Sequence, residues 1–108
     1  MKKIVAYKSY YKDFIASLQR EEQLKIRRVL ALFSTEDRIP HHFIKYLDED
    51  LYELRITLPN REARLFFIYD GDTMVVIFNC FIKKTQKTPQ KEIEKAKRLK
   101  KEYEESRK

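Results

Sequence analysis

The single glycine of this 108-residue chain lies between two long runs of apolar residues. It is Gly71, within Asp70-Gly71-Asp72, and a lone Asp-Gly in this setting is typical of a tight hairpin turn. The run before it, 62–69, is rich in aromatic residues, and the run after it, 73–82, is almost continuously apolar. We therefore predict two antiparallel strands, the second of which is apolar enough to be a central strand covered on both faces.

Three further segments have strand-like patterns. Residues 51–56 alternate apolar and polar side chains, which is the period of a half-buried strand, and turn residues follow at 58–61. This predicts three successive antiparallel strands. Residues 4–8 predict an additional edge strand, 43–47 a weaker one, and the polar segment 34–42 a connecting loop.

Helical periodicity occupies the rest of the chain. A first helix is expected after Ser9 as N-cap, and a second from about Glu21 to Phe33, with a break near Gln19-Arg20 that makes the two a helical hairpin. A last helix is expected to open with Thr88 as cap and Pro89 at the first helical position. The apolar positions on which these helices rest are Phe14, Ile15 and Leu18, then Ile26, Val29, Leu30 and Phe33, and finally Ile93, Ala96, Leu99 and Tyr103.

These elements predict one α+β domain over residues 1–108. An N-terminal strand and a helical hairpin would pack on a small, mainly antiparallel twisted sheet, followed by a C-terminal helix. Cys80 is the only cysteine, so the chain has no internal disulfide and no thiolate metal site. Its apolar neighbours predict a buried, unreactive thiol, and we expect neither a metal nor a small-molecule cofactor.

The positive charge is concentrated near the C-terminus. The chain has a formal charge of +7, and residues 83–101 alone contain nine Lys or Arg and two Glu, so this stretch accounts for the whole excess. Nucleic acid, an acidic membrane surface and an acidic protein are all suitable anionic partners. No segment approaches the roughly 20 apolar residues of a membrane span, and no secretory signal is evident, so we expect a cytoplasmic protein without a membrane partner.

Four cations are candidates for a common site. If the strands form a meander with short loops, Arg55 and Arg64 lie on neighbouring strands, with Lys83 and Lys84 at the end of the third. Such a group suits phosphate, because arginine offers a planar fork of donors and lysine a compact charge. Lys87, Lys91 and Arg61 are the further candidates for RNA binding.

The same four cations are also candidates for catalysis of RNA cleavage. Attack of a 2′-hydroxyl on its own phosphate needs a proton acceptor, stabilisation of the phosphorane charge and a donor for the leaving 5′-oxygen. A lysine surrounded by arginines is a candidate base, because like charges disfavour its protonated form. The alternative is that Arg55 with Glu53, and Arg64 with Glu62, are ordinary solvated strand charges.

Aromatic residues and histidines are weaker candidates. Phe66, Tyr69 and Phe81 are interleaved with the cations and suit base stacking, although strands this apolar favour them as core residues. His41 and His42 are the only histidines, and in a strand they would point to opposite faces, which disfavours a cooperating pair.

Three segments, 51–56, 63–72 and 81–89, resemble the RelE/HigB superfamily of bacterial toxins, most closely its phage-related Gp49-like branch. The most specific pieces are the Tyr-Glu-Leu-Arg strand that ends at Arg55 and the Phe-Ile-Lys-Lys-Thr-Gln-Lys-Thr-Pro junction that begins at Phe81. The resemblance implies a RelE-like fold and the toxin of a type II toxin–antitoxin system. Such a toxin enters the ribosomal A site, cleaves mRNA without a metal, and is neutralised by a helix-turn-helix antitoxin.

The resemblance also assigns site residues. It places Arg55, Arg64 and Lys84 at catalytic positions, with Lys83 beside them. Glu53 stands where a second lysine is common, and no tyrosine begins the final helix, so the resemblance does not identify the general base. Two alternatives stay open at this point: a ParE-like toxin that inhibits DNA gyrase, and a non-catalytic module that binds RNA or an antitoxin.

Overall fold

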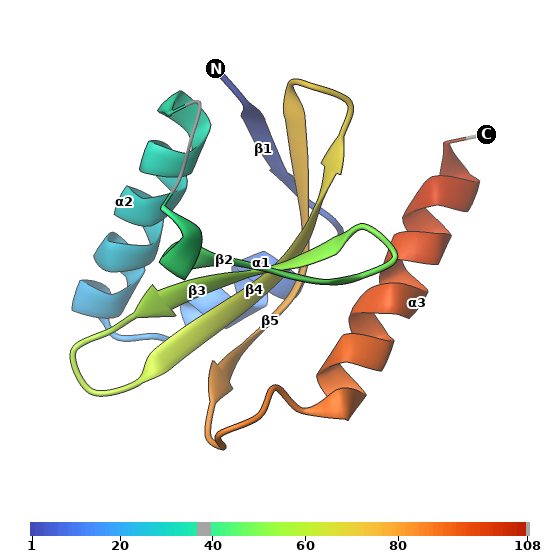
Figure 1. Ribbon diagram of the computed structural model, residues 1–108. Helices are drawn as coiled ribbons and strands as arrows, with labels where there is room; N and C mark the ends of the chain where they lie inside the picture. The colour runs from blue at the N-terminus through green and yellow to red at the C-terminus, as the bar shows by residue number, and fades with distance from the viewer. Residues whose placement is uncertain (37–39, 108) are drawn as a thin grey trace.

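The computed structural model describes residues 1–36 and 40–107, and within them five strands form one mixed sheet (Figure 1). The strand order is β1-β5-β4-β3-β2, with β1 parallel to β5 and every other neighbouring pair antiparallel. This confirms the predicted α+β class, the meander and both edge strands. The strands are β1 (Lys3–Ala6), β2 (Ile44–Asp48), β3 (Leu51–Thr57), β4 (Glu62–Asp70) and β5 (Met74–Lys83).

The hairpin between β4 and β5 forms at the predicted glycine. Asp70 pairs with Met74, and Gly71 has a φ of 72°, which lies in the left-handed region that favours glycine. β5 lies between β1 and β4, as expected for a central strand. Its side chains alternate between two apolar clusters, with Val75 and Ile77 in one and Val76 and Phe78 in the other.

Helices α1 (Tyr10–Ala16) and α2 (Arg20–Thr35) cover one face of the sheet. The predicted stripe of α2 is buried at Ile26, Val29 and Phe33. Ser9 occupies the N-cap position of α1, as predicted, but its hydroxyl donates to the Asp13 carboxylate at 3.1 Å and makes no cap hydrogen bond. The first helix therefore begins without a side-chain cap.

The other face of the sheet is covered by α3 (Gln90–Ser106) through Ala96 and Leu99 (Figure 1). The helix begins one residue later than predicted, and Pro89 occupies the N-cap position. Thr88 does not cap it, because its hydroxyl donates to the Glu53 carboxylate at 2.7 Å. A buried carboxylate needs hydrogen-bond donors, and the Glu53 carboxylate accepts the Thr88 hydroxyl that could otherwise have capped the helix.

The segment expected as a loop over 34–42 is more ordered than predicted at both ends. Helix α2 continues through Thr35, and a 3₁₀ turn, η1 (His41–Phe43), leads into β2. The predicted loop residues 37–39 lie outside the described part of the chain. None of the helices in residues 1–36 and 40–107 is long and apolar enough to cross a bilayer.

Candidate functional site

The strand register brings the predicted cations to one end of the sheet. Arg55 of β3 pairs directly with Arg64 of β4, and Glu62 of β4 pairs with Lys83 of β5. Alternation along the strands places these side chains on the α3 face, because Phe66 lies two residues beyond Arg64 and belongs to the cluster under α3. Lys84 follows directly at the end of β5.

Arg64 is unusually enclosed for a charged side chain, with 3% of its surface exposed. Its Nη1 lies 3.1 Å from Oε1 of Glu62, and its Nε lies 3.6 Å from Oε1 of Glu53. The second distance is an ion pair that is too long for a hydrogen bond. The buried Nε atoms of Arg64 and Arg55 have no hydrogen-bond partner among the described residues. Two guanidinium groups are thus held in place with donors still unused.

Glu53 organises this end of the sheet. It is 1% exposed, accepts the hydroxyl proton of Thr88, and lies 3.6 Å from Nε of both Arg55 and Arg64. The buried carboxylate therefore connects β3, β4 and the loop that follows β5. The alternative prediction was that Glu53 pairs with Arg55 and Glu62 with Arg64 as ordinary solvated charges. Both pairs are present, but Glu53 and Arg64 are buried rather than solvated.

The charges of the cluster are unevenly balanced. Glu53 and Glu62 offset the two arginines, so the excess positive charge comes from Lys83, which is half-buried, and Lys84, which is exposed. These lysines line a pocket of about 440 Å³ together with Glu62, Thr85 and Gln86. Because Lys84 faces solvent, it is not enclosed by the arginines as the candidate-base interpretation required.

Two of the three candidate RNA-binding residues lie beside this pocket in the chain. Lys87 is exposed in the loop between β5 and α3, and Lys91 is exposed in the first turn of α3. Together with Lys83 and Lys84 they form a cationic strip, defined here as these four lysines. In the chain, these four residues run from the end of β5 through the following loop to the first turn of α3.

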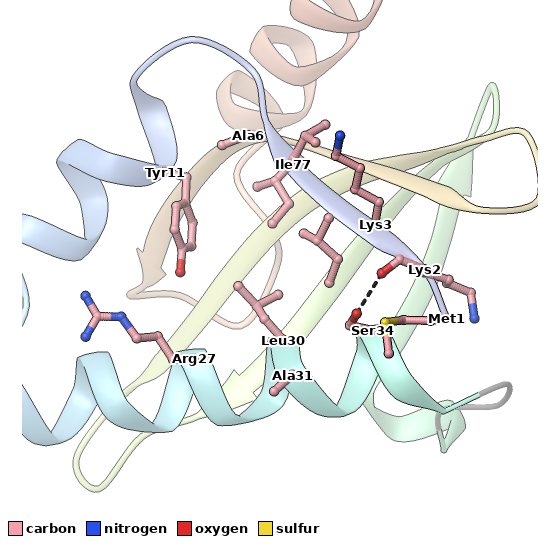
Figure 2. Close-up of a pocket in the computed structure, with 12 residues that line it drawn as sticks. Met1, Lys2, Lys3, Ala6, Tyr11, Arg27, Leu30, Ala31, Ser34 and Ile77 are labelled. Carbon is pink, nitrogen blue, oxygen red and sulfur yellow. Dashed lines mark hydrogen bonds between the residues drawn. The ribbon is translucent and has the colours of Figure 1, made fainter.

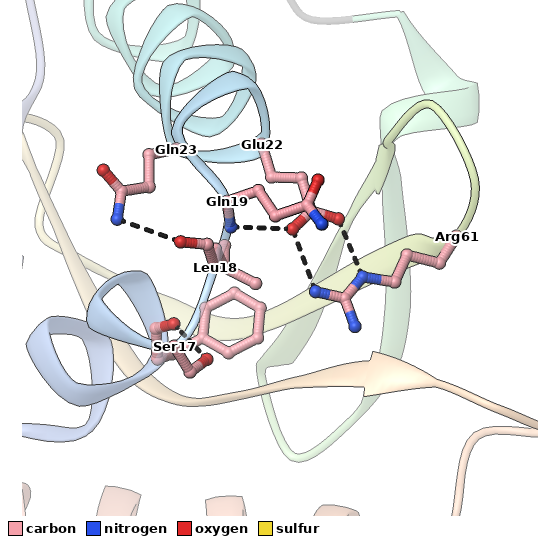
Figure 3. Close-up of polar contacts among 7 residues, drawn as sticks. Ser17, Leu18, Gln19, Glu22, Gln23 and Arg61 are labelled. Carbon is pink, nitrogen blue, oxygen red and sulfur yellow. Dashed lines mark hydrogen bonds and ion pairs between the residues drawn. The ribbon is translucent and has the colours of Figure 1, made fainter.

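Arg61 is engaged elsewhere. Its Nε and Nη2 donate to the two carboxylate oxygens of Glu22 at 2.7 and 2.9 Å, as Figure 3 shows. The Arg61 guanidinium and the backbone N–H of Gln19 lower the pKa of Glu22 to about 2, from its ordinary 4.5. The pair joins the start of α2 to the β3–β4 turn, so the structure does not bring Arg61 into the cationic strip.

The aromatic candidates are mostly core residues. Phe66 is fully buried, and the ring of Phe81 lies 5.5 Å from that of Phe66. Tyr69 is 39% exposed and lies beside the rings of Phe33 and Phe67 on the α2 face. His42 is exposed and stacks near Phe43, which packs into the cluster beneath α1 and α2. His42 therefore belongs to a different face from the arginines, and the side chain of His41 lies outside the described residues.

Cys80 is half-buried rather than fully buried as predicted, and desolvation raises the pKa of its thiol far above the ordinary value, as expected of an unreactive thiol. Among residues 1–36 and 40–107, no group of three or more His, Cys, Asp or Glu side chains is placed to hold a metal ion.

A second pocket, of about 620 Å³, lies between β1 and α2 (Figure 2). Ile4, Leu30 and Ile77 form apolar walls, Arg27 lies at one end, and the Ser34 hydroxyl donates to the Lys2 carbonyl oxygen at 2.6 Å at the other. The walls of this pocket suit an apolar group. This pocket is not the predicted phosphate site, because the cationic donors lie at the other site, at one end of strands β3, β4 and β5.

Glu53 and Thr88 are members of this cluster that the sequence does not predict. The sequence indicates Glu53 only as a possible partner of Arg55 and as an unusual residue for its position. A carboxylate two residues before an arginine in an otherwise half-apolar strand is the local signal that was available. The contact with Thr88 joins residues 35 positions apart, and no local pattern reveals it.

Comparison with known proteins adds a family and a fold. The family model described as "Phage derived protein Gp49-like (DUF891)" matches residues 13–101. A chain in the crystal structure of the archaeal RelE–RelB complex from Pyrococcus horikoshii OT3 superposes with a TM-score of 0.55 at 15% identity, over 75% of this chain and 93% of that one.

A second similar structure is the solution structure of the conserved hypothetical protein HP0894 from Helicobacter pylori. It has a TM-score of 0.50 and 14% identity, and covers 76% of this chain and 94% of that one. Identities this low establish the fold alone. No curated protein sequence matches the chain significantly.

Proposed function

Because the chain belongs to the phage-derived Gp49-like family, within the RelE/HigB superfamily, we propose that it is the toxin of a type II toxin–antitoxin system. Its RelE-like fold supports this proposal. The partner that neutralises it would be a helix-turn-helix antitoxin, and the crystallised complex of RelE with RelB is consistent with an antitoxin partner in general. The protein would act in the cytoplasm.

The proposed activity is metal-independent cleavage of mRNA in the ribosomal A site. The observation that carries it is the convergence of Arg55, Arg64 and Lys83 at one end of the sheet, beside a pocket that Lys83 and Lys84 line. Donors fixed in advance at a site that is partly screened from water stabilise developing charge well. Arg55 and Arg64 would hold the phosphate and stabilise the phosphorane.

The lysines have a second role in this proposal. Lys83 and Lys84 would neutralise the attacked phosphate, since both line the pocket at the end of β5. Lys87 and Lys91 would follow the RNA backbone along the cationic strip, which suits a flexible polyanion because ammonium groups contact phosphate without strict geometry. Arg61 is omitted, because two of its donors are used by Glu22.

The proposal is tested by mapping mRNA 5′ ends after induced expression of the chain. Wild type should arrest growth and produce cuts in phase with codons. Arg55→Ala with Lys84→Ala should remove both effects, and Arg55 is preferred to Arg64 because its side chain is 38% exposed and its loss leaves less buried charge unpaired. Lys12→Ala with Lys101→Ala, at exposed positions outside the cluster, is the matched control.

Three results would contradict the activity. Wild-type cutting by a folded Arg55→Ala/Lys84→Ala variant would refute the site. Intact transcripts with a DNA-damage response would instead indicate a gyrase inhibitor. Ribosome binding that leaves mRNA whole would indicate a non-catalytic binding module.

A further inference from the structure

The candidate site contains a carboxylate that is open to solvent. Glu62 begins β4, its side chain is 50% exposed, and it lines the pocket that also contains Lys83 and Lys84. We propose that Glu62 is the general base that takes the proton from the attacking 2′-hydroxyl. This assignment rests on the proposed ribonuclease function and names a residue for a step that the four cations do not supply.

The two carboxylates of the cluster differ in access. Glu53 is 1% exposed, its Oε2 accepts from Thr88, and its Oε1 faces two guanidinium groups. A base must come within hydrogen-bond reach of the hydroxyl that it deprotonates, and the surrounding groups exclude a nucleotide from Glu53. Glu62 lies at the strand end, where a substrate can approach it.

Arg64 fixes the carboxylate of Glu62, because its Nη1 lies 3.1 Å from Oε1 of Glu62. The ammonium groups of Lys83 and Lys84 line the same pocket as this carboxylate and can contact a phosphate oxygen there. A 2′-hydroxyl is separated from its own 3′-phosphate by only a few bonds, so a phosphate held there brings the hydroxyl near Glu62.

The neighbouring lysines supply the acid. Lys83 pairs with Glu62 across β4 and β5, and Lys84 is the more exposed of the two lysines. A protonated ammonium can donate to a leaving oxygen but cannot accept a proton. The cluster then contains one accessible acceptor and one exposed donor, which are the two groups that transesterification needs.

The proposed step balances as follows. Glu62 takes the 2′-hydroxyl proton while the 2′-oxygen forms its bond to phosphorus. The bond from phosphorus to the 5′-oxygen breaks, and that oxygen takes a proton from the Lys84 ammonium. The products are a 2′,3′-cyclic phosphate and a free 5′-hydroxyl. Proton exchange with water then restores the carboxylate and the ammonium, so no oxidant, reductant or metal takes part.

A structural role for Glu62, in which it only holds Arg64, makes different predictions. Glu62→Gln keeps an oxygen that can accept from Arg64 but is not a useful base at neutral pH. Glu62→Asp keeps a base on a shorter arm. Glu94→Gln is the matched control, since it removes one negative charge from an exposed position on α3.

The experiment measures single-turnover cleavage of ribosome-bound mRNA by the full chain, together with ribosome affinity and the dependence of rate on pH. Glu62→Gln should slow cleavage by at least about 100-fold, the typical contribution of a general base. Its affinity should be unchanged or tighter, because a negative charge has been removed. The wild-type fall in rate toward acidic pH, where a carboxylate takes up a proton, should be absent. Glu62→Asp should recover part of the rate, and Glu94→Gln should match wild type.

The outcomes separate the two proposals. Equal cleavage by wild type and Glu62→Gln refutes the base assignment alone. A slow Glu62→Gln variant that keeps the wild-type pH profile, or a Glu62→Asp variant as slow as Glu62→Gln, assigns Glu62 the structural role and also refutes it. A folded wild-type chain that leaves ribosome-bound mRNA whole refutes the proposed function and this assignment together.

Discussion

At the scale of single residues, two buried glutamates hold segments together that are distant in sequence. Glu22 is 5% exposed and links the start of α2 to Arg61 in the β3–β4 turn. Glu53 links the sheet to the loop before α3 through Thr88. A carboxylate removed from water is tolerated only where donors or cations compensate it, so each glutamate depends on its particular partners.

The Thr88 contact can be tested by stability. Thr88→Val keeps the shape of the side chain and removes the hydroxyl that donates to the buried Glu53 carboxylate. We expect the free energy of unfolding to fall by about 1–3 kcal/mol, the cost of an unsatisfied buried acceptor, as measured by urea titration. Thr85→Val is the control, because its hydroxyl donates to the Lys87 carbonyl oxygen in an exposed turn. Equal losses in the two variants would contradict the anchoring role.

The Glu22–Arg61 pair predicts that the free energy of unfolding depends on pH in the acidic range. The pKa of Glu22 is about 2 in the folded chain and 4.5 ordinarily, so its stabilising contribution is complete above about pH 4.5 and is lost as pH falls toward 2. Over this window the free energy of unfolding of wild type should fall more steeply than that of Glu22→Gln. Denaturant titrations at a series of pH values measure both slopes.

The control for that series is Glu21→Gln, an exposed glutamate in the same helical turn. It should keep the wild-type slope. A Glu22→Gln variant with the wild-type slope would show that the acid sensitivity arises elsewhere.

At the scale of elements, α3 is attached to the sheet by apolar packing and by several polar contacts. Its buried residues are Ala96 and Leu99. Near its start, Nδ2 of Asn79 donates to both the carbonyl and the carboxylate oxygen of Glu92, at 3.1 and 3.0 Å. Near its end, the Tyr103 hydroxyl donates to the Asp70 carboxylate. Lys97 of α3 also forms an ion pair with Asp48 of β2 at 3.0 Å, so the helix is held by an apolar centre and by polar contacts along its length.

Truncation of the apolar centre tests this attachment. Leu99→Ala removes a side chain that is 1% exposed, and we expect a loss of about 2–5 kcal/mol in the free energy of unfolding. Arg98→Ala, at the exposed neighbouring position, should change it by less than about 0.5 kcal/mol. Thermal or urea unfolding monitored by circular dichroism measures both variants. A cost for Leu99→Ala no larger than that of the control would mean that α3 docks through other contacts.

At the scale of the whole molecule, the excess positive charge and the apolar pocket lie in different parts of the protein. The excess of +7 resides in residues 83–101, which form the end of β5, the following loop and much of α3. The pocket between β1 and α2 lies on the face of the sheet that α1 and α2 cover, whereas Arg64 lies on the α3 face. A polyanion would therefore meet one side of the protein, and the apolar pocket is on another.

The salt dependence of RNA affinity tests whether RNA binds on this charged side. Each phosphate contact on single-stranded RNA releases counterions and contributes about 0.7 to the slope of log affinity against log salt concentration. Lys87→Ala with Lys91→Ala should therefore reduce the slope for binding to single-stranded RNA by about 1.4. Lys12→Ala with Lys25→Ala, which removes the same charge from the α1–α2 side, should leave it unchanged. Equal reductions would show that the RNA is not confined to the cationic strip.

The sequence predicts most elements here because their signals are local. A lone Asp-Gly identifies the hairpin, and three- and four-residue spacing identifies α2. The site is harder to predict, because Arg55 and Arg64 meet only if a register is assumed, and the register is confirmed only by the structure. Thr88 was misassigned since its local context suits a helix cap, whereas a carboxylate 35 residues away takes its hydroxyl. The local sequence likewise does not reveal that Glu22 accepts two of the donors of Arg61.

The parallel pairing of β1 with β5 has a consequence for how the protein is made. Lys3 pairs with Met74, so the first strand to leave the ribosome cannot reach its place until the last strand has also been synthesised. At translation speeds of roughly 5–20 residues per second, that interval is about 4–14 s. The loop that completes the cationic site is made later still. A nascent chain of this protein therefore has no assembled site until the loop between β5 and α3 has been synthesised.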